Sequence, residues 1–141
     1  MAINIKMQGL DVAFASIDKK VKLFEQDIKE ELNEWANGTA LRAKQLAPKD
    51  EGGLAGSINP NYYGKELKAS ITVAKFYAAY VEFGTGNFAA AYTSGLPSDW
   101  QDFAMEFYVN GKGRMPARPY LYPAVKENNK KLVDNLKNLF K

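Results

Sequence analysis

The strongest constraint on the fold is one apolar stripe that recurs every three or four residues between Ile17 and Leu46. This period matches one face of an α-helix, so the stripe predicts a long amphipathic helix from about residue 11 to residue 46. Pro48 ends this helix, because the residue before a proline disfavours helical geometry. Gly38 lies within it and marks either a slight bend or a point of close packing. The stripe consists of Ile17, Val21, Phe24, Ile28, Leu32, Trp35, Thr39, Ala43 and Leu46.

The predicted helix is long for a chain of 141 residues. About 30 residues at roughly 1.5 Å each extend over about 45 Å. The radius of gyration of a compact domain of this size is only about 14 Å. One end of the helix should therefore extend past the core of the monomer. We expect Ile17, Val21 and Phe24 to form an interface with another subunit.

The rest of the chain predicts a small sheet and a second long helix. Pro60 lacks the N–H that a central strand needs, so the strand that contains it should lie at a sheet edge. The predicted fold class is α+β, with a small, mainly antiparallel sheet packed against a long N-terminal helix and a C-terminal helix. One domain covers residues 1–141. The segment 77–83 fits either a short helix or a strand, and we favour the helix. The remaining elements are a short strand or extended arm at Ile3, Ile5 and Met7, strands at 58–63, 66–74 and 104–109, a helical turn after Ser98, and a helix at 123–140 with the stripe Val125, Leu132, Val133, Leu136 and Phe140.

The chain contains no cysteine and no histidine, which excludes several kinds of chemistry. Without cysteine there is no disulfide, no thiolate zinc ligand and no cysteine nucleophile. Without histidine, the usual general base and the commonest transition-metal ligand are missing. A glycosidase would need two facing carboxylates, and nothing in the sequence pairs Asp50, Glu51 or Glu82 in that way. We therefore predict a protein that is not an enzyme and has no catalytic residue, metal or cofactor.

Charge and hydropathy give weaker information about location and partners. The net charge of +3 is mild, so it permits an acidic partner without specifying one. The first residues lack the basic and apolar regions of a signal peptide. No apolar run approaches the roughly 20 residues that span a bilayer. We expect a protein that is used in a cytoplasm, or in a particle assembled there, without a membrane partner.

Three short segments carry a specific resemblance. They read Ala47-Pro-Lys-Asp-Glu-Gly-Gly-Leu54, Tyr77-Ala-Ala-Tyr-Val-Glu-Phe-Gly-Thr85 and Met115-Pro-Ala-Arg-Pro-Tyr-Leu-Tyr-Pro-Ala124. Their order between two long helices resembles the head–tail joining family (neck or tail-completion proteins) of tailed bacteriophages, the tail-component family of lambda-like phages. In the first segment, Glu51 stands where the family has threonine, and Ala55 stands where a basic residue is usual.

The resemblance implies a structural virion protein. Six or twelve copies would form a ring at the neck, which joins the DNA-filled head to the tail and continues the DNA channel. The partners would be other copies of the chain, the adjacent connector or head-completion and tail proteins, and double-stranded DNA held without sequence specificity. The protein would be found in the virion, and in the host cytoplasm during assembly.

Two further hypotheses come from the residues themselves. Glu82 and Arg118 lie among apolar, backbone-restricting neighbours, where an unpaired charge is costly, so we predict that they form an ion pair. The segment 86–114 is longer than the family pattern and rich in aromatic residues, which are favoured interface anchors. It is either an arm that contacts a neighbouring subunit or a locally packed helix-plus-strand insert. The aromatic residues predicted for the interface are Phe88, Tyr92, Trp100 and Phe103.

Two alternatives from other functional classes stay open. The first is a nucleic-acid-binding module that uses Lys112, Arg114 and the lysines of the last helix. Such a module would lose DNA affinity steeply with added salt. The second, less favoured, is a small cell-wall hydrolase, which turnover of peptidoglycan would reveal.

Overall fold

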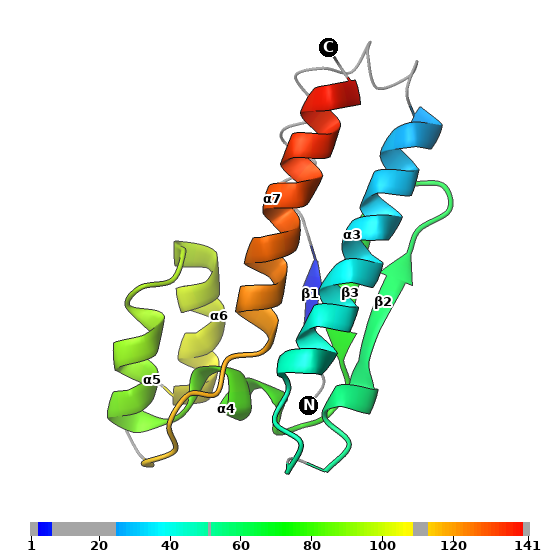
Figure 1. Ribbon diagram of the computed structural model, residues 1–141. Coiled ribbons are helices and arrows are strands. Elements are labelled where there is room, and N and C mark those ends of the chain that lie inside the picture. The colour runs from blue at the N-terminus through cyan, green and yellow to red at the C-terminus, as the bar shows by residue number, and fades with distance from the viewer. Residues whose placement is uncertain (1–2, 7–24, 51, 109–112, 140–141) are drawn as a thin grey trace.

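The computed structural model describes residues 3–6, 25–50, 52–108 and 113–139, and it has the predicted α+β class. The elements are β1 (Ile3–Lys6), α3 (Glu25–Leu46), the 3₁₀ turn η1 (Ala55–Ser57), β2 (Ile58–Tyr62), β3 (Ala69–Val73), α4 (Ala78–Phe83), α5 (Gly86–Thr93), α6 (Ser98–Tyr108) and α7 (Leu121–Leu139). The long helices α3 and α7 are antiparallel and pack beside a small sheet, and the shorter helices α4, α5 and α6 lie at one end (Figure 1). The predicted interface residues Ile17, Val21 and Phe24 lie outside the described residues.

The sheet is antiparallel, with strand order β1-β3-β2. Pro60 of β2 lies opposite Ile71 of the central strand, and its own strand is at the edge, as the missing N–H requires. The backbone N–H of Ala74 donates to the carbonyl of Ser57 at 3.1 Å. Because such bonds alternate along an antiparallel pair, Pro60 lies at a position that does not bond to β3.

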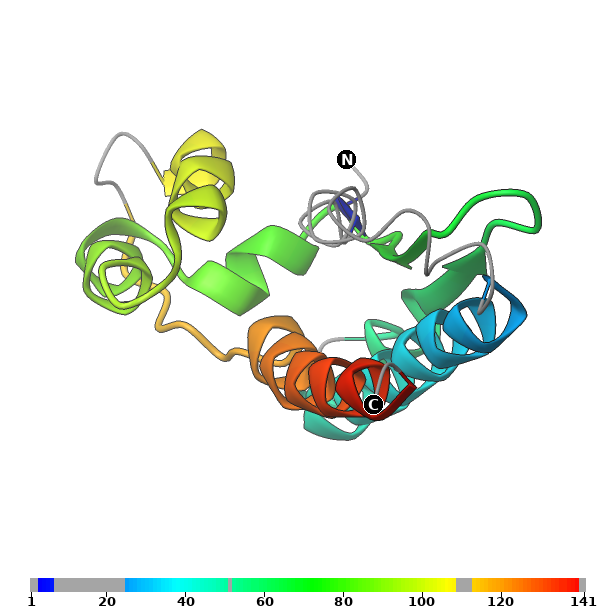
Figure 2. The same ribbon diagram turned by 90° about the horizontal axis from the view of Figure 1, so that it is seen from above.

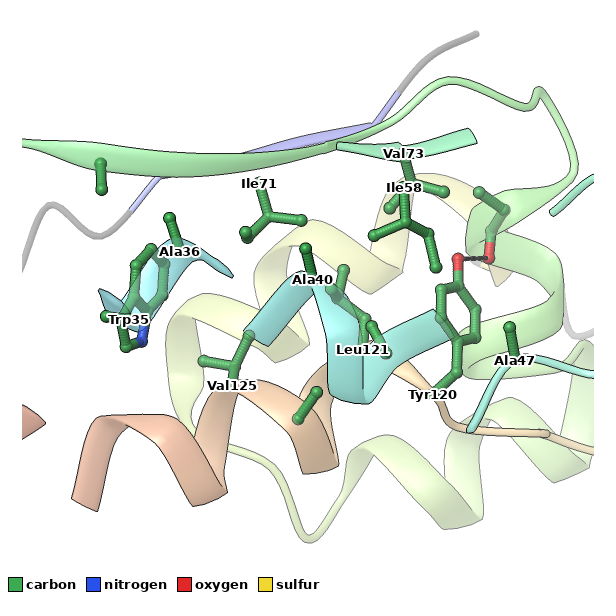
Figure 3. Close-up of a cluster of buried hydrophobic side chains, with 14 of the residues drawn as sticks. Trp35, Ala36, Ala40, Ala47, Ile58, Ile71, Val73, Tyr120, Leu121 and Val125 are labelled. Atoms are coloured by element: carbon green, nitrogen blue, oxygen red, sulfur yellow. Dashed lines mark hydrogen bonds between the residues drawn. The ribbon is translucent and has the colours of Figure 1, made fainter. Parts of the chain in front are cut away.

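Helix α3 lies against the sheet, and α7 packs along α3. Ile71 and Val73 point from the sheet towards Ala36 and Ala40 of α3 (Figure 3). The small alanine side chains allow the helix to approach the strands closely. The predicted stripe is confirmed from Ile28 to Ala43, since these side chains are buried, and Leu46 at its end is half-buried. The buried face of α3 consists of Ile28, Leu32, Trp35, Ala36, Thr39, Ala40 and Ala43.

Gly38 is a point of close packing between the two long helices. A Cβ atom at this position would lie 2.5 Å from Oδ1 of Asn128 on α7. Asn128 is buried, and its amide donates to the carbonyl of Ala124 at 2.9 Å. A polar residue therefore occupies a core position of α7, whereas Val133 of the predicted stripe is 42% exposed. Helix α7 begins two residues earlier than predicted, at Leu121.

The segment 86–108 forms two helices, so the predicted strand at 104–109 is wrong for the residues that the structure describes. The aromatic residues Trp100, Phe103 and Phe107 are three and four positions apart in the sequence, which is a helical spacing. The short apolar run around Ala104 resembles a strand, so the helical spacing of the aromatic residues is easily missed. Figure 2 shows α5 and α6 as a lobe, with α4 between this lobe and the sheet. The short helix predicted at 77–83 is confirmed as α4.

Candidate functional site at the junction of three motifs

The second and third motif segments lie side by side. The N–H of Thr85 donates to the carbonyl of Met115 at 2.8 Å, and the N–H of Arg118 donates to the carbonyl of Val81 at 2.8 Å. The hydroxyl of Thr85 in turn accepts the N–H of Met115 at 2.8 Å. These two hydrogen bonds between Thr85 and Met115 hold together the two ends of the segment that lies between them. We call the region where the segments 47–54, 77–85 and 115–124 meet the motif junction.

Gly84 allows the two segments to approach each other. Its φ is +77°, in the left-handed region that favours glycine. A Cβ atom here would lie 2.7 Å from the backbone nitrogen of Ala117 and 2.7 Å from the carbonyl oxygen of Met115. Both obstacles are backbone atoms, which cannot turn aside as a flexible side chain can. Any other residue at this position would force the segments apart.

Glu82 is completely buried, and its carboxylate accepts hydrogen bonds at the start of α7. Its Oε1 accepts the N–H groups of Tyr120 at 3.0 Å and of Leu121 at 2.6 Å. Its Oε2 accepts the hydroxyl of Tyr92 at 2.9 Å. The first N–H groups of a helix have no partner within the helix, and the helix dipole favours an anion beside them. Glu82 therefore caps α7 from a distant part of the sequence.

The environment of Glu82 acts on its pKa in two directions. Burial raises the pKa of this carboxyl above its usual value, because the charged form loses its hydration. The hydrogen bonds from the backbone of Leu121 and Tyr120 and from the hydroxyl of Tyr92 act in the opposite direction. Burial is the larger effect. It also raises the pKa of Tyr92 and Tyr120, and the neighbouring Glu82 charge adds to that shift.

The predicted ion pair between Glu82 and Arg118 is wrong. Arg118 pairs instead with Asp50, at 2.8 Å between Nη2 and Oδ1 and 3.3 Å between Nη1 and Oδ2. Glu82 is satisfied by N–H and O–H donors within the protein core, whereas the Arg118 side chain is 42% exposed and lies where the first motif reaches it. The Arg118 guanidinium holds the pKa of Asp50 below its usual value. This pair joins the first motif to the third.

A second contact joins the first motif to the second. The hydroxyl of Tyr77 donates to the carbonyl of Gly52 at 2.5 Å. The junction is closed from within by Tyr120, whose buried hydroxyl donates to the carbonyl of Ala78 at 3.0 Å (Figure 3). All three motifs therefore meet through direct hydrogen bonds.

The aromatic lobe packs on its own subunit. The buried ring of Phe83 lies 6.5 Å from Tyr92, 6.3 Å from Trp100 and 6.0 Å from Phe103, measured between ring centroids. Trp100 also meets Tyr122 edge-to-face at 5.0 Å. Tyr92, Trp100 and Phe103 are half-buried against the core, whereas Phe88 is 46% exposed. The structure thus favours local packing over an extended arm, and only Phe88 of the four predicted interface aromatics is a largely exposed ring.

Sequence reasoning missed Asp50, Tyr77, Tyr92 and Tyr120 as polar partners at the junction. The one available signal was position in the sequence, because all but Tyr92 lie within the three motifs.

The described part of the chain contains no group of three or more Asp or Glu side chains arranged to hold a metal ion. None of its described helices is long and apolar enough to cross a membrane. Comparisons with protein-family models, curated proteins and solved structures find no match.

Proposed function

We propose that this protein is a structural subunit of a ring at the neck of a tailed bacteriophage, which joins the DNA-filled head to the tail. The observation that carries the proposal is the motif junction. The three segments are far apart in the chain, and they resemble one family in their order and amino-acid sequence. They meet through Asp50–Arg118, Tyr77–Gly52 and the capping of α7 by Glu82. These contacts show that the three segments depend on one another in the fold, which supports reading them as one functional unit.

The exposed apolar side chains are suited to assembly. Phe76 is 68% exposed and stands next to Tyr77 of the junction, with the two rings edge-to-face at 5.3 Å. Phe88 and Met105 are exposed on the lobe. Large aromatic side chains at the centre of an interface often dominate its binding energy. Contacts between copies, or with adjacent rings, would therefore use Phe76 beside the motif junction, which we call the junction tip, and the exposed side chains of the lobe.

Mass measurement tests the proposal directly. The purified chain is measured alone and after mixing with the adjacent virion proteins, and the expected species contains six or twelve copies. In parallel, an infection by phage that lacks the protein should yield filled heads and free tails instead of joined particles. A chain that stays monomeric in every mixture, together with normal particles formed in its absence, would contradict a neck ring.

The alternatives give different outcomes. A nucleic-acid-binding module would bind DNA as a monomer, and Arg114 is exposed, whereas Lys112 lies outside the described residues. A hydrolase would release fragments from peptidoglycan. The two described carboxylates considered for such a reaction, Asp50 and Glu82, are engaged with Arg118 and with the start of α7. No contact at the motif junction favours either alternative.

A further inference from the structure

A polar pocket lies between the first turns of α3 and the connection from β2 to β3, far from the motif junction. Its volume is about 220 Å³. Gln26, Lys29 and Asn33 share one face of α3, since they are three and four residues apart. Tyr62 ends β2, and the connection that follows supplies the remaining wall. The lining residues are Gln26, Lys29, Asn33, Tyr62, Tyr63, Gly64, Glu66 and Lys68.

Two lysines in this wall are held in place. The ammonium group of Lys29 donates to the carbonyl of Gly64 at 3.1 Å. The ammonium group of Lys68 lies over the ring of Tyr63, 4.7 Å from its centroid. Both side chains are only 24% exposed. Lysine side chains are usually extended into water, so two lysines whose side chains are largely covered and tethered in one pocket wall are unusual.

The nearby carboxylates leave this positive charge accessible. Glu25 is 3.5 Å from Lys29 and 51% exposed, and Glu66 is 3.9 Å from Lys68 and 66% exposed. Both ion pairs are loose and their carboxylates are largely exposed, so the pairs contribute little. Glu66 also lines the pocket, so the lining residues carry two positive charges and one negative charge. An ammonium group has three N–H donors, so each lysine keeps donors for a ligand. The amide of Gln26 already donates to Glu30 at 3.4 Å and keeps a second N–H, and the amide of Asn33 adds further donors.

We propose that this pocket binds a phosphate group, and that the phosphodiester backbone of double-stranded DNA is its physiological source. Two cations and several N–H donors around a small concave site suit a tetrahedral oxyanion. Lysine binds phosphate as a point charge, without the planar geometry that arginine imposes. The choice of DNA rests on the proposed function, in which DNA passes through the ring. Phosphate binding itself requires only the monomer.

Titration of the full-length, isotope-labelled chain tests the pocket. Inorganic phosphate and a short DNA duplex should each shift the backbone NMR signals of Lys29, Gly64 and Lys68. The double variant Lys29→Gln/Lys68→Gln should bind the duplex at least about tenfold more weakly. Its plot of log affinity against log salt should become shallower by about 1.8, the value for two lost phosphate contacts. The charge-conserving Lys29→Arg/Lys68→Arg variant should retain most of the affinity.

A matched control removes the same charge elsewhere. Lys44 and Lys49 lie at the end of α3 opposite the pocket, and Lys49 is exposed. The Lys44→Gln/Lys49→Gln variant should change affinity and salt slope much less. Equal losses in both double variants would overturn the pocket, as would signal shifts confined to other residues. Displacement of phosphate by a polyglutamate peptide at the same concentration would overturn phosphate selectivity. Phosphate binding without ring assembly would contradict the neck proposal and leave the pocket standing.

Discussion

At the scale of single residues, Glu82 shows how a buried charge is satisfied without a counter-ion from the neighbouring motif. The energetic argument that a buried charge needs partners was correct, but the partner predicted from it was not. Backbone N–H groups at the start of α7 accomplish what an arginine was expected to do. Such donors belong to every residue, so no pattern of side-chain types in the sequence identifies them.

The pKa of Glu82 predicts a pH dependence of stability. Its folded pKa is raised above the usual value of 4.5, so folding favours the protonated carboxyl. The resulting stabilisation is present below the unfolded pKa and is lost as pH rises through the folded pKa. Glu82→Gln keeps a carbonyl oxygen for the N–H groups of α7 but does not titrate. The free energy of unfolding of the wild type, minus that of the variant, should therefore decrease as pH rises from about 4 towards neutrality.

Urea denaturation at a series of pH values measures this difference. Tyr92→Phe serves as a companion variant, because it removes one hydrogen bond to Glu82 without removing the carboxyl. It should raise the folded pKa further and move the loss of stability to higher pH. A wild type that gains stability over Glu82→Gln with rising pH would show that the hydrogen bonds outweigh burial.

Gly84 predicts a second single-residue effect. Gly84→Ala places a Cβ against backbone atoms at 2.7 Å, in a conformation with φ of +77°. Strain of this kind typically costs about 1–3 kcal/mol before any steric overlap is added. We expect a loss of about 3 kcal/mol or more in the free energy of unfolding. Gly56→Ala is the control, because its Cβ would meet open space, and it should change stability little. Equal effects of the two substitutions would contradict the close approach.

At the scale of elements, the regular spacing of apolar residues along the sequence determined which helices and strands could be predicted. The stripe from Ile28 to Ala43 recurs through several turns, and the predicted helix is confirmed over its described part, Glu25–Leu46. The predicted part before residue 25 lies outside the described residues. The run 104–109 is too short for its period to be decisive, and α6 was mistaken for a strand there. The motif order indicated that the segments belong together. It could not indicate that Arg118 reaches Asp50, because that choice depends on how the first motif turns after α3.

The contact between α3 and α7 predicts coupling between two residues. Gly38→Ala should destabilise the protein by about 1–2 kcal/mol, because the new methyl group overlaps Asn128 and overpacking outweighs the gain in helix propensity. Asn128→Ala removes the obstacle. The double variant Gly38→Ala/Asn128→Ala should therefore be more stable than the sum of the two single effects predicts. Thermal denaturation of all four proteins measures the coupling, and strictly additive effects would place the two residues out of contact.

At the scale of the whole molecule, the lobe contributes to the stability of the monomer and also carries the side chains that we propose for assembly. Tyr92, Trp100 and Phe103 pack around Phe83, and Tyr92 also binds Glu82. Removing the lobe would expose Phe83 and weaken the cap on α7. The lobe is therefore part of the fold of the monomer, and a deletion from 87 to 112 would test stability together with assembly. Single substitutions separate the two roles.

Phe88 and Phe103 make the final prediction, because they are the same residue type on the lobe but Phe88 is exposed and Phe103 packs against the core. Phe103→Ala removes part of the ring cluster and should cost about 2 kcal/mol of monomer stability. Phe88→Ser changes a ring that is 46% exposed and should alter monomer stability by less than about 0.5 kcal/mol. If the lobe contacts a neighbouring subunit in the ring, Phe88→Ser should nevertheless reduce the fraction of assembled protein. Denaturation and mass measurement on the same samples distinguish the effects. Normal assembly of Phe88→Ser would remove Phe88 from the interface and leave the junction tip at Phe76 as the next surface to change.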